Sequence, residues 1–409
     1  MDKSVWIVAA RRTAMGSFQG QFSSLAAPKL GAFAIRGVME SARVAPDLVD
    51  EVYMGCVLPA GLGQAPARQA ALGAGLPSST GCTTINKVCG SGMKSVMLAH
   101  DLIQAGTAST VIAGGMESMS NAPYLQKDAR KGLRLGHSSF YDHMFLDGLQ
   151  DAYEGQLMGF YAQQIADRYE FTREEMDNWA ALSAERAVAA QLTDVHDDEI
   201  VPVRLEESKR AVSLIEQDEH PGEIKIEKIA ALKPAFAKEG TVTAANSSAI
   251  SDGAAALLVM DAELAKQKGL EPLAIIRGHT THARPPSEFT IAPVYAIRQL
   301  LDKLNWSVAD VDLWEINEAF AVVTQIAIRD LGLGESKVNI HGGACALGHP
   351  IGASGARILV TLIHALRHRA SALAADSLGS ESPALMKGIA ALCIGGGEAT
   401  AVAIEVPVL

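Results

Sequence analysis

A cysteine at a glycine-rich turn is the first residue in this sequence that could do chemistry. Cys89 is followed by Gly90 and Gly92, which let the backbone turn sharply and leave N–H groups unshielded near the sulfur. From Ser91 to Gly106 apolar residues recur at helical spacing, so Cys89 would lie at a helix N-terminus. The helix dipole there favours a thiolate, which indicates a nucleophile. The structural alternative is a small buried cysteine in a tight turn.

Three residues in the second half of the chain have side chains suited to acyl or proton transfer. His349 stands between a glycine and a proline, so a rigid turn presents its ring, and we interpret it as the base that makes Cys89 a thiolate. Asn317 could orient a water or donate to an oxyanion, or could cap the backbone locally. Cys393 precedes three glycines that would expose N–H groups, and it is either a second acid or base or a buried thiol.

The pattern around these residues is that of alternating strands and helices. Helical patterns begin near residues 30, 63 and 91, and they separate short apolar runs typical of buried strands. These runs occupy residues 5–10, 51–57, 83–88, 110–113 and 254–260. Such alternation predicts an α/β layered fold, in which the strand at 83–88 delivers Cys89 to its turn.

The second half of the chain repeats the order of elements of the first. Residues 44–52 are echoed by 308–315, and the glycine-rich turn at 86–94 is echoed by 339–355. In both halves a strand then ends in consecutive glycines. Two similar halves are therefore predicted, with matching turns that face each other, so that the chemistry lies between the halves.

Changes in composition and charge pattern along the chain predict the domain boundaries. A charged and irregular stretch at 121–246 is a long insertion into the first half of the chain, and the pattern of a buried core resumes at 247–271. We therefore expect residues 1–120 and 247–271 to form one half and residues 272–409 the other. The stretch 369–383, rich in alanine and serine, is expected to be an exposed helix extension or a loop without a function of its own.

Composition limits the partners and the compartment. A net charge of -11 over 409 residues disfavours nucleic acid as a partner. The five cysteines are odd in number and lack C-x-x-C spacing, which argues against a disulfide framework and against a zinc site. No apolar run reaches the length of a membrane span or of a signal-peptide core. We expect a cytoplasmic protein with no membrane partner and no metal site.

Four motifs, in order along nearly the whole chain, carry a family resemblance. They are CGSGMK at 89–94, NEAF at 317–320, GHPIGASGAR at 348–357 and CIGGG at 393–397. With these motifs the sequence resembles the thiolases, and among them the acetyl-CoA acetyltransferase (acetoacetyl-CoA thiolase) group. The resemblance favours the catalytic interpretation of Cys89 over the structural one.

The resemblance implies a ping-pong acyl transfer that joins two acetyl-CoA molecules into acetoacetyl-CoA and CoA, and that can run in reverse. Cys89, activated by His349, would carry the acetyl group, and Cys393 would remove the α-proton of the second acetyl-CoA. Asn317 would position a water that forms one oxyanion hole with His349. The backbone amides of Cys89 and Gly395 would form the other. CoA and acyl-CoA are then substrates, and no cofactor is expected.

The fold implied by the resemblance has two βαβαβαββ halves in a five-layer α/β/α/β/α core. The stretch 121–246 would be a loop domain that covers CoA. Ser248 matches a serine that contacts pantetheine, and Phe236 and Phe320 match apolar residues that line its pocket. Members of the family are dimers or tetramers, so we expect a homodimer or a homotetramer.

Some residues depart from the pattern of the short-chain enzymes. Leu157, beside Met158, stands where those enzymes usually have a histidine, and Phe289 stands where methionine is common. Both changes lie near the expected thioester pocket and could alter the preference for acyl chain length. The residues from Glu398 to Thr400, after the last glycines, also differ from the commoner family sequence. Cys345 stands where an aliphatic residue is usual, and we expect it in the core.

Two other functions stay open at this point. One is a 3-ketoacyl-CoA thiolase that prefers longer chains in fatty-acid degradation, and the other is a non-catalytic acyl-CoA binding protein on the same fold. The presence together of Cys89, His349, Asn317 and Cys393 argues against the binding protein. A papain-like hydrolase is disfavoured, because its mechanism uses neither a second cysteine nor a two-half repeat. A decarboxylating ketosynthase is disfavoured because it typically pairs one cysteine with two histidines.

Overall fold

The computed structural model describes residues 3–206, 212–376 and 385–408, and a single large mixed sheet runs through it. Its strands follow the order β13-β14-β15-β12-β1-β11-β5-β3-β4. In chain order they are β1 (Val5–Thr13), β3 (Glu51–Gly55), β4 (Gly81–Ile85), β5 (Thr110–Ser118), β11 (Ser251–Asp261), β12 (Ala274–Ala283), β13 (Leu313–Ile316), β14 (Leu385–Ile394) and β15 (Glu398–Pro407). The short strands β2 (Gly16–Ser17) and β8 (Ile200–Val201) pair with β11 and β1.

The sheet consists of two halves with the same strand order, which confirms the predicted repeat. β1-β11-β5-β3 in the first half corresponds to β12-β15-β14-β13 in the second. In each half the first two strand pairings are antiparallel, and the third pairing is parallel. β1 pairs directly with β12, with Val5 opposite Ile276, and so joins the two halves.

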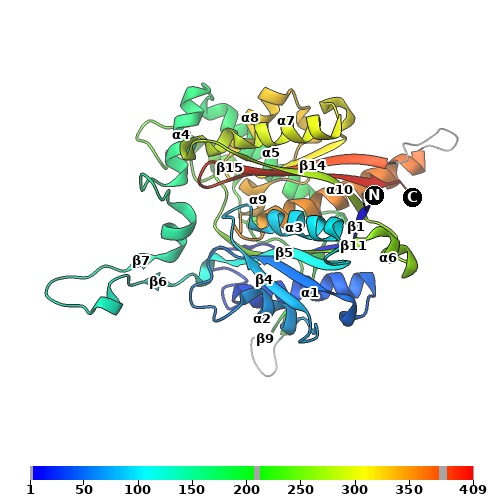
Figure 1. Cartoon of the computed structure of the whole chain (residues 1–409). Coiled ribbons are helices and arrows are strands. Elements are labelled where there is room, and N and C mark those ends of the chain that lie inside the picture. The colour runs from blue at the N-terminus through cyan, green and yellow to red at the C-terminus, as the bar shows by residue number, and fades with distance from the viewer. Residues whose placement is uncertain (1–2, 207–211, 377–384, 409) are drawn as a thin grey trace.

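Helices cover both outer faces of the sheet and fill the space between its halves. They are α1 (Ala27–Ala42), α2 (Pro66–Gly73), α3 (Ser91–Ala105), α6 (Ala262–Gln267), α7 (Ala292–Leu304), α8 (Ala321–Leu331), α9 (Ala344–Leu347) and α10 (Ser354–Asp376). α3 and α10 contact each other and strands of both halves. Figure 1 shows this central pair of helices with β5 on one side and β14 and β15 on the other, α1 and α2 below, and α7 and α8 above. The predicted five-layer α/β/α/β/α order is therefore confirmed.

Three apolar cores hold the five layers together, because each strand of a central sheet is buried on both faces. One core joins α1 and α2 to the first half, a second surrounds α3 and α10, and a third lies under α7 and α8. The continuous apolar runs of the sequence are the strands that separate these cores. Every residue of β5 is buried, and so is every residue of β11 except Asp261.

In the described part of the stretch 121–246, the main elements are two α-helices and two hairpins. The helices are α4 (Met158–Arg168) and α5 (Arg173–Gln191), and the hairpins pair β6 (Tyr124–Leu125) with β7 (Tyr141–Asp142) and β9 (Val203–Glu206) with β10 (Val212–Ile215). The β6–β7 arm extends away from the body (Figure 1). None of the helices in the described parts of the chain is long and apolar enough to cross a membrane.

Several element boundaries differ from the sequence predictions; for example, β1 continues to Thr13 and β5 to Ser118, beyond the predicted ends of their apolar runs. β4 ends at Ile85, three residues before the predicted end, because residues after it form the turn that holds Cys89. α10 continues to Asp376, so the first part of the stretch 369–383 is helical, as one of its two interpretations required. Residues 377–383 lie outside the described residues.

Candidate active site

Side-chain hydrogen bonds build the turn that presents Cys89. The Asn86 carboxamide oxygen accepts the backbone N–H of Val88 at 3.0 Å, and the Ser91 hydroxyl donates to the Val88 carbonyl at 2.6 Å. These bonds hold Val88 at a φ of 46°, a left-handed value that a β-branched residue rarely adopts. The end of the Ile394 side chain packs against Gly90, where a Cβ would lie 2.3 Å from it. The turn places Cys89 just before α3, as the sequence predicts.

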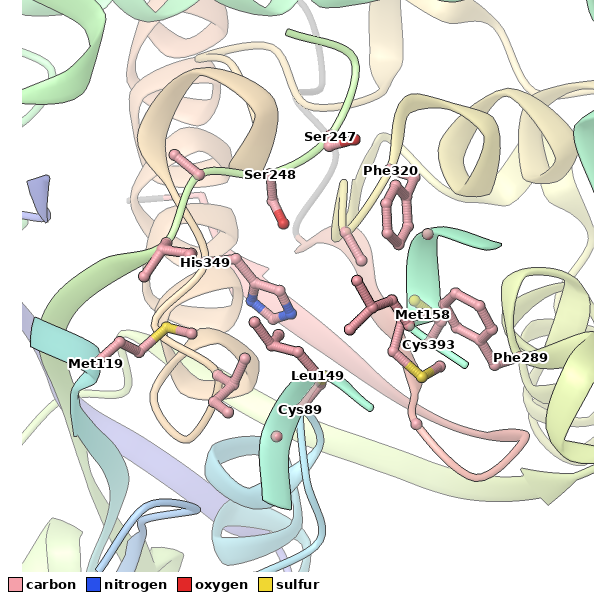
Figure 2. A pocket seen from close by; sticks show the side chains of 18 of the residues that line it. Cys89, Met119, Leu149, Met158, Ser247, Ser248, Phe289, Phe320, His349 and Cys393 are labelled. Atoms are coloured by element: carbon pink, nitrogen blue, oxygen red, sulfur yellow. The ribbon is translucent and has the colours of Figure 1, made fainter. Parts of the chain in front are cut away.

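The second half of the chain brings three loops to the same place. His349 follows α9, Asn317 follows β13, and Gly395 follows β14. Cys89, His349, Cys393 and Gly395 line one cavity, and Figure 2 shows the labelled cysteines and the histidine on its walls. Asn317 is buried next to this cavity without lining it, and its amide nitrogen lies 3.4 Å from His349 Nε2. The structure therefore brings all five predicted catalytic residues together.

Ser354 orients the histidine, and it is a residue that the sequence analysis missed. Its hydroxyl lies 2.5 Å from His349 Nδ1 and donates to the Pro350 carbonyl at 2.9 Å. Because the Ser354 hydroxyl donates its hydrogen to Pro350, its oxygen accepts a hydrogen bond from His349 Nδ1–H. The other ring nitrogen, Nε2, is then unprotonated and can accept a proton on the cavity side. The serine five residues after the histidine was the only signal in the sequence.

Burial keeps the resting site neutral, contrary to the predicted thiolate. Burial raises the pKa of Cys89 to about 11, although the backbone N–H groups of Gly395 and Cys89 itself point at the sulfur and lower it. Burial, followed by the nearby Arg357 charge, lowers the pKa of His349 to about 3. The loss of water outweighs the helix N-terminus here, so the resting pair is a thiol and a neutral imidazole.

Cys393 is also a thiol in the resting site. Burial raises its pKa well above the usual value, and the proximity of Cys89 adds to the effect. Ionising the second of two neighbouring cysteines costs more free energy than ionising the first, since the two thiolates would repel each other. Only one of them is therefore expected to be ionised at a time during a reaction.

Alkylation of Cys89 tests this neutral resting state. In the absence of CoA compounds, we expect the rate with iodoacetamide to rise about tenfold per pH unit from pH 7 to 9, because the thiolate is the reactive form. Peptide mapping separates Cys89 from the half-buried Cys82. A rate that is flat across neutral pH would instead indicate a thiolate–imidazolium pair.

Backbone and side-chain donors are arranged for two oxyanions. The N–H groups of Cys89 and Gly395 both reach the sulfur, where a tetrahedral adduct of a thioester would place its oxygen close by. Asn317 Nδ2 and His349 Nε2 form a second polar pair, and the buried Asn317 Oδ1 has no partner among the described residues. The arrangement can stabilise negative charge on either side of Cys89.

The predicted binding residues all line the same cavity, which is mainly apolar. They are Ser248, Leu157, Met158, Phe236, Phe289 and Phe320. The Phe320 ring packs edge-to-face on Phe236 and on Phe289, with centroids 6.1 Å apart in each pair. The sequence analysis missed further lining residues, among them Met119, Phe145, Leu149, Ser247 and Ile351. Several of these come from irregular segments that have no periodic pattern to mark them.

Two carboxylates tie the catalytic loops of the two halves together. Glu117 on β5 accepts the backbone N–H groups of Val57 and Gly352, both at 2.9 Å, and so anchors the turn that follows His349. Burial raises the Glu117 pKa to about 7. Glu398 forms an ion pair with Lys87, which joins the loop after β14 to the turn before Cys89. Cys345 is buried outside this cavity, in the expected core position.

Comparisons with known proteins match the chain over nearly its full length. Family models for the thiolase N-terminal and C-terminal domains match residues 5–263 and 270–406. An acetyl-CoA acetyltransferase of Chromobacterium violaceum is 47% identical over 98% of this chain and 100% of the relative. Acetyl-CoA acetyltransferase 1 of Arabidopsis thaliana is 47% identical over 98% of this chain and 94% of its own.

Solved structures show the same similarity. An acetyl-CoA acetyltransferase of Bacillus anthracis has a TM-score of 0.92 and 40% identity, and covers 99% of both chains. A thiolase of Ascaris suum, solved in complex with coenzyme A, has a TM-score of 0.90 and 39% identity, over 99% of this chain and 100% of that one. The fold and the site define a two-half α/β protein with two cysteines and a histidine between its halves. The chain belongs to the thiolase family, within its acetyl-CoA acetyltransferase group.

Proposed function

We propose that the protein is an acetyl-CoA C-acetyltransferase, which condenses two acetyl-CoA molecules reversibly into acetoacetyl-CoA and CoA. The observation that carries this proposal is the meeting of Cys89, Cys393 and His349 in one apolar cavity. The names of relatives that are 47% identical over 98% of the chain support the same activity. CoA and acyl-CoA are its substrates, and the proposed steps use no other cofactor.

Acyl transfer begins from the neutral resting site. His349 Nε2 takes the proton of Cys89 as the sulfur attacks the thioester carbonyl, and the N–H groups of Cys89 and Gly395 stabilise the oxyanion. The adduct collapses with cleavage of its bond to the CoA sulfur. The leaving CoA thiolate takes the proton of Cys393, so free CoA departs and Cys393 remains as a thiolate.

Condensation then uses the base that acyl transfer has produced. Cys393 removes an α-proton from the second acetyl-CoA, and the enolate oxygen is stabilised by His349 Nε2–H together with a water that Asn317 positions. The α-carbon attacks the acetyl group, the bond to Cys89 breaks, and the imidazolium of His349 returns its proton to the sulfur. Both cysteines are thiols again, the imidazole is neutral, and acetoacetyl-CoA leaves.

The preference for chain length is tested by thiolysis of ketoacyl-CoA substrates of increasing length. We expect activity to be highest with acetoacetyl-CoA, because the packed rings of Phe289 and Phe320 line the same cavity as the two cysteines and take up apolar space in it. In Phe289→Ala, kcat/KM for longer ketoacyl-CoA substrates relative to that for acetoacetyl-CoA should rise by roughly tenfold, since the substitution opens apolar space in the cavity. Phe18→Ala, at a side chain that is 49% exposed and does not line the cavity, serves as the control. A wild-type maximum well beyond four carbons would make the protein a long-chain thiolase instead.

Exposed apolar side chains on the β6–β7 arm support an oligomer. Tyr124, Leu135 and Phe140 are 66%, 104% and 70% exposed, and apolar clusters of this kind mark contact surfaces. We therefore keep the proposal of a homodimer or homotetramer, which light scattering coupled to gel filtration would test.

The five free cysteines support a reducing compartment such as the cytoplasm, where the enzyme would serve lipid metabolism.

A further inference from the structure

Two histidines and an aspartate meet far from the catalytic cavity. His100 and Asp101 lie near the end of α3, and His279 lies on β12 in the other half of the fold. Asp101 Oδ1 is 3.2 Å from His100 Nδ1 and 2.9 Å from His279 Nε2. The two rings are perpendicular, with centroids 5.1 Å apart. Nothing in the acyl-transfer chemistry uses these residues.

The spacing of the three donor atoms fits a metal ion. Zinc binds imidazole nitrogen and carboxylate oxygen at about 2.0–2.2 Å, so neighbouring ligands of a tetrahedral site lie about 3.4 Å apart. The separations of 3.2 Å and 2.9 Å are within about half an ångström of that spacing, and all three donors lie within 4.8 Å of one another. Small side-chain shifts would therefore place all three at bonding distance of one ion.

The surroundings leave the site both preorganised and accessible. The side chains of His100 and His279 are only 14% and 13% exposed, so packing fixes their rings, whereas Asp101 is 51% exposed and opens the site to solvent. Lys303 donates to the backbone carbonyl of His279 at 3.3 Å, and its positive charge opposes a bound cation. This charge argues for moderate rather than very tight binding.

We propose that His100, Asp101 and His279 form a site for one divalent transition-metal ion, with zinc as the best match and water in the fourth position. Two imidazoles and a carboxylate are a donor set that suits zinc. The ion would fasten α3, the helix that follows Cys89, to strand β12 of the second half. The sequence predicted no metal site, because His279 is 178 residues from Asp101 and only the fold brings them together.

Cobalt(II) titration of the reduced, metal-free protein tests the proposal, because its absorption reports the ligands. We expect about one Co²⁺ per chain, with tetrahedral d–d bands and without the charge-transfer band that cysteine ligands produce. Zinc should displace the cobalt and raise the melting temperature. His279→Ala and, separately, Asp101→Asn should lose this binding.

His282→Ala is the matched control, since His282 lies on the same strand and stacks on Tyr295 rather than joining the cluster. This variant should bind cobalt as the wild type does. Equal cobalt binding in wild type and Asp101→Asn, whose changed side chain is exposed and isosteric, would overturn the proposal. So would the absence of any binding to the wild type, and the cluster would then be a hydrogen-bonded triad only.

Discussion

Replacing Cys393 by alanine is expected to abolish condensation while leaving the acetylation of Cys89 detectable. The variant lacks the thiol that protonates the leaving CoA and then removes the α-proton of the second acetyl-CoA. Loss of a positioned acid or base typically lowers a rate by about 10²–10⁴-fold, and this residue serves in both roles. We therefore expect the steady-state rate of acetoacetyl-CoA formation to fall by at least about 10³-fold.

The measurement combines a steady-state assay with the intact mass of the protein after mixing with acetyl-CoA. Cys393→Ala should carry an acetyl group that forms more slowly than in the wild type and then accumulates, since the next step is blocked. Cys345→Ala is the control, because Cys345 is an equally buried thiol outside the cavity and should be dispensable for turnover. Normal condensation by Cys393→Ala would show that another group is the base.

Replacing Cys89 by alanine is expected to remove both half-reactions. With no sulfur to carry the acetyl group, neither condensation nor thiolysis has an acyl-enzyme intermediate, and oxyanion donors alone cannot replace it. Removal of a nucleophile that acts as a unit with its base costs about 10⁶-fold in a well-studied hydrolase, so activity should fall below detection. The exchange reaction between acetyl-CoA and labelled CoA should also disappear.

Cys82→Ala provides the comparison for that experiment. Cys82 lies on β4, is half-buried, and takes no part in the cavity, so exchange and condensation should continue in that variant. Binding of CoA to Cys89→Ala should be retained, because the apolar wall around Phe320 is unchanged. If Cys89→Ala still exchanged labelled CoA, the nucleophile would have to be a different residue.

The layers and the repeat of this fold could be predicted because they depend on patterns that are local in sequence. Apolar runs such as 110–113 are buried strands, and the helical spacing after Ser91 is α3. Boundaries were less predictable where side chains compete with the backbone. β4 ends at Ile85 because Asn86 and Ser91 bond to the turn and stop the strand early.

The members of the catalytic site could be predicted, but not their protonation. Each residue stands in a motif with recognisable composition: Cys89, His349 and Asn317 follow the end of a strand or short helix, and Cys393 is the last residue but one of β14. Their pKa values depend on burial by residues from distant segments, and burial overrides the local helix N-terminus. The lining residue Leu149 and the cluster of Asp101 with His279 likewise depend on contacts that only the folded chain creates.

A peptide map of the wild-type protein, quenched shortly after mixing with acetyl-CoA, tests directly whether Cys89 carries the acetyl group. We expect one acetyl group, located on the peptide that contains Cys89, and its removal when free CoA is added before the quench. An acetyl group on Cys393 instead, or no acetyl adduct while acetoacetyl-CoA still forms, would contradict this expectation.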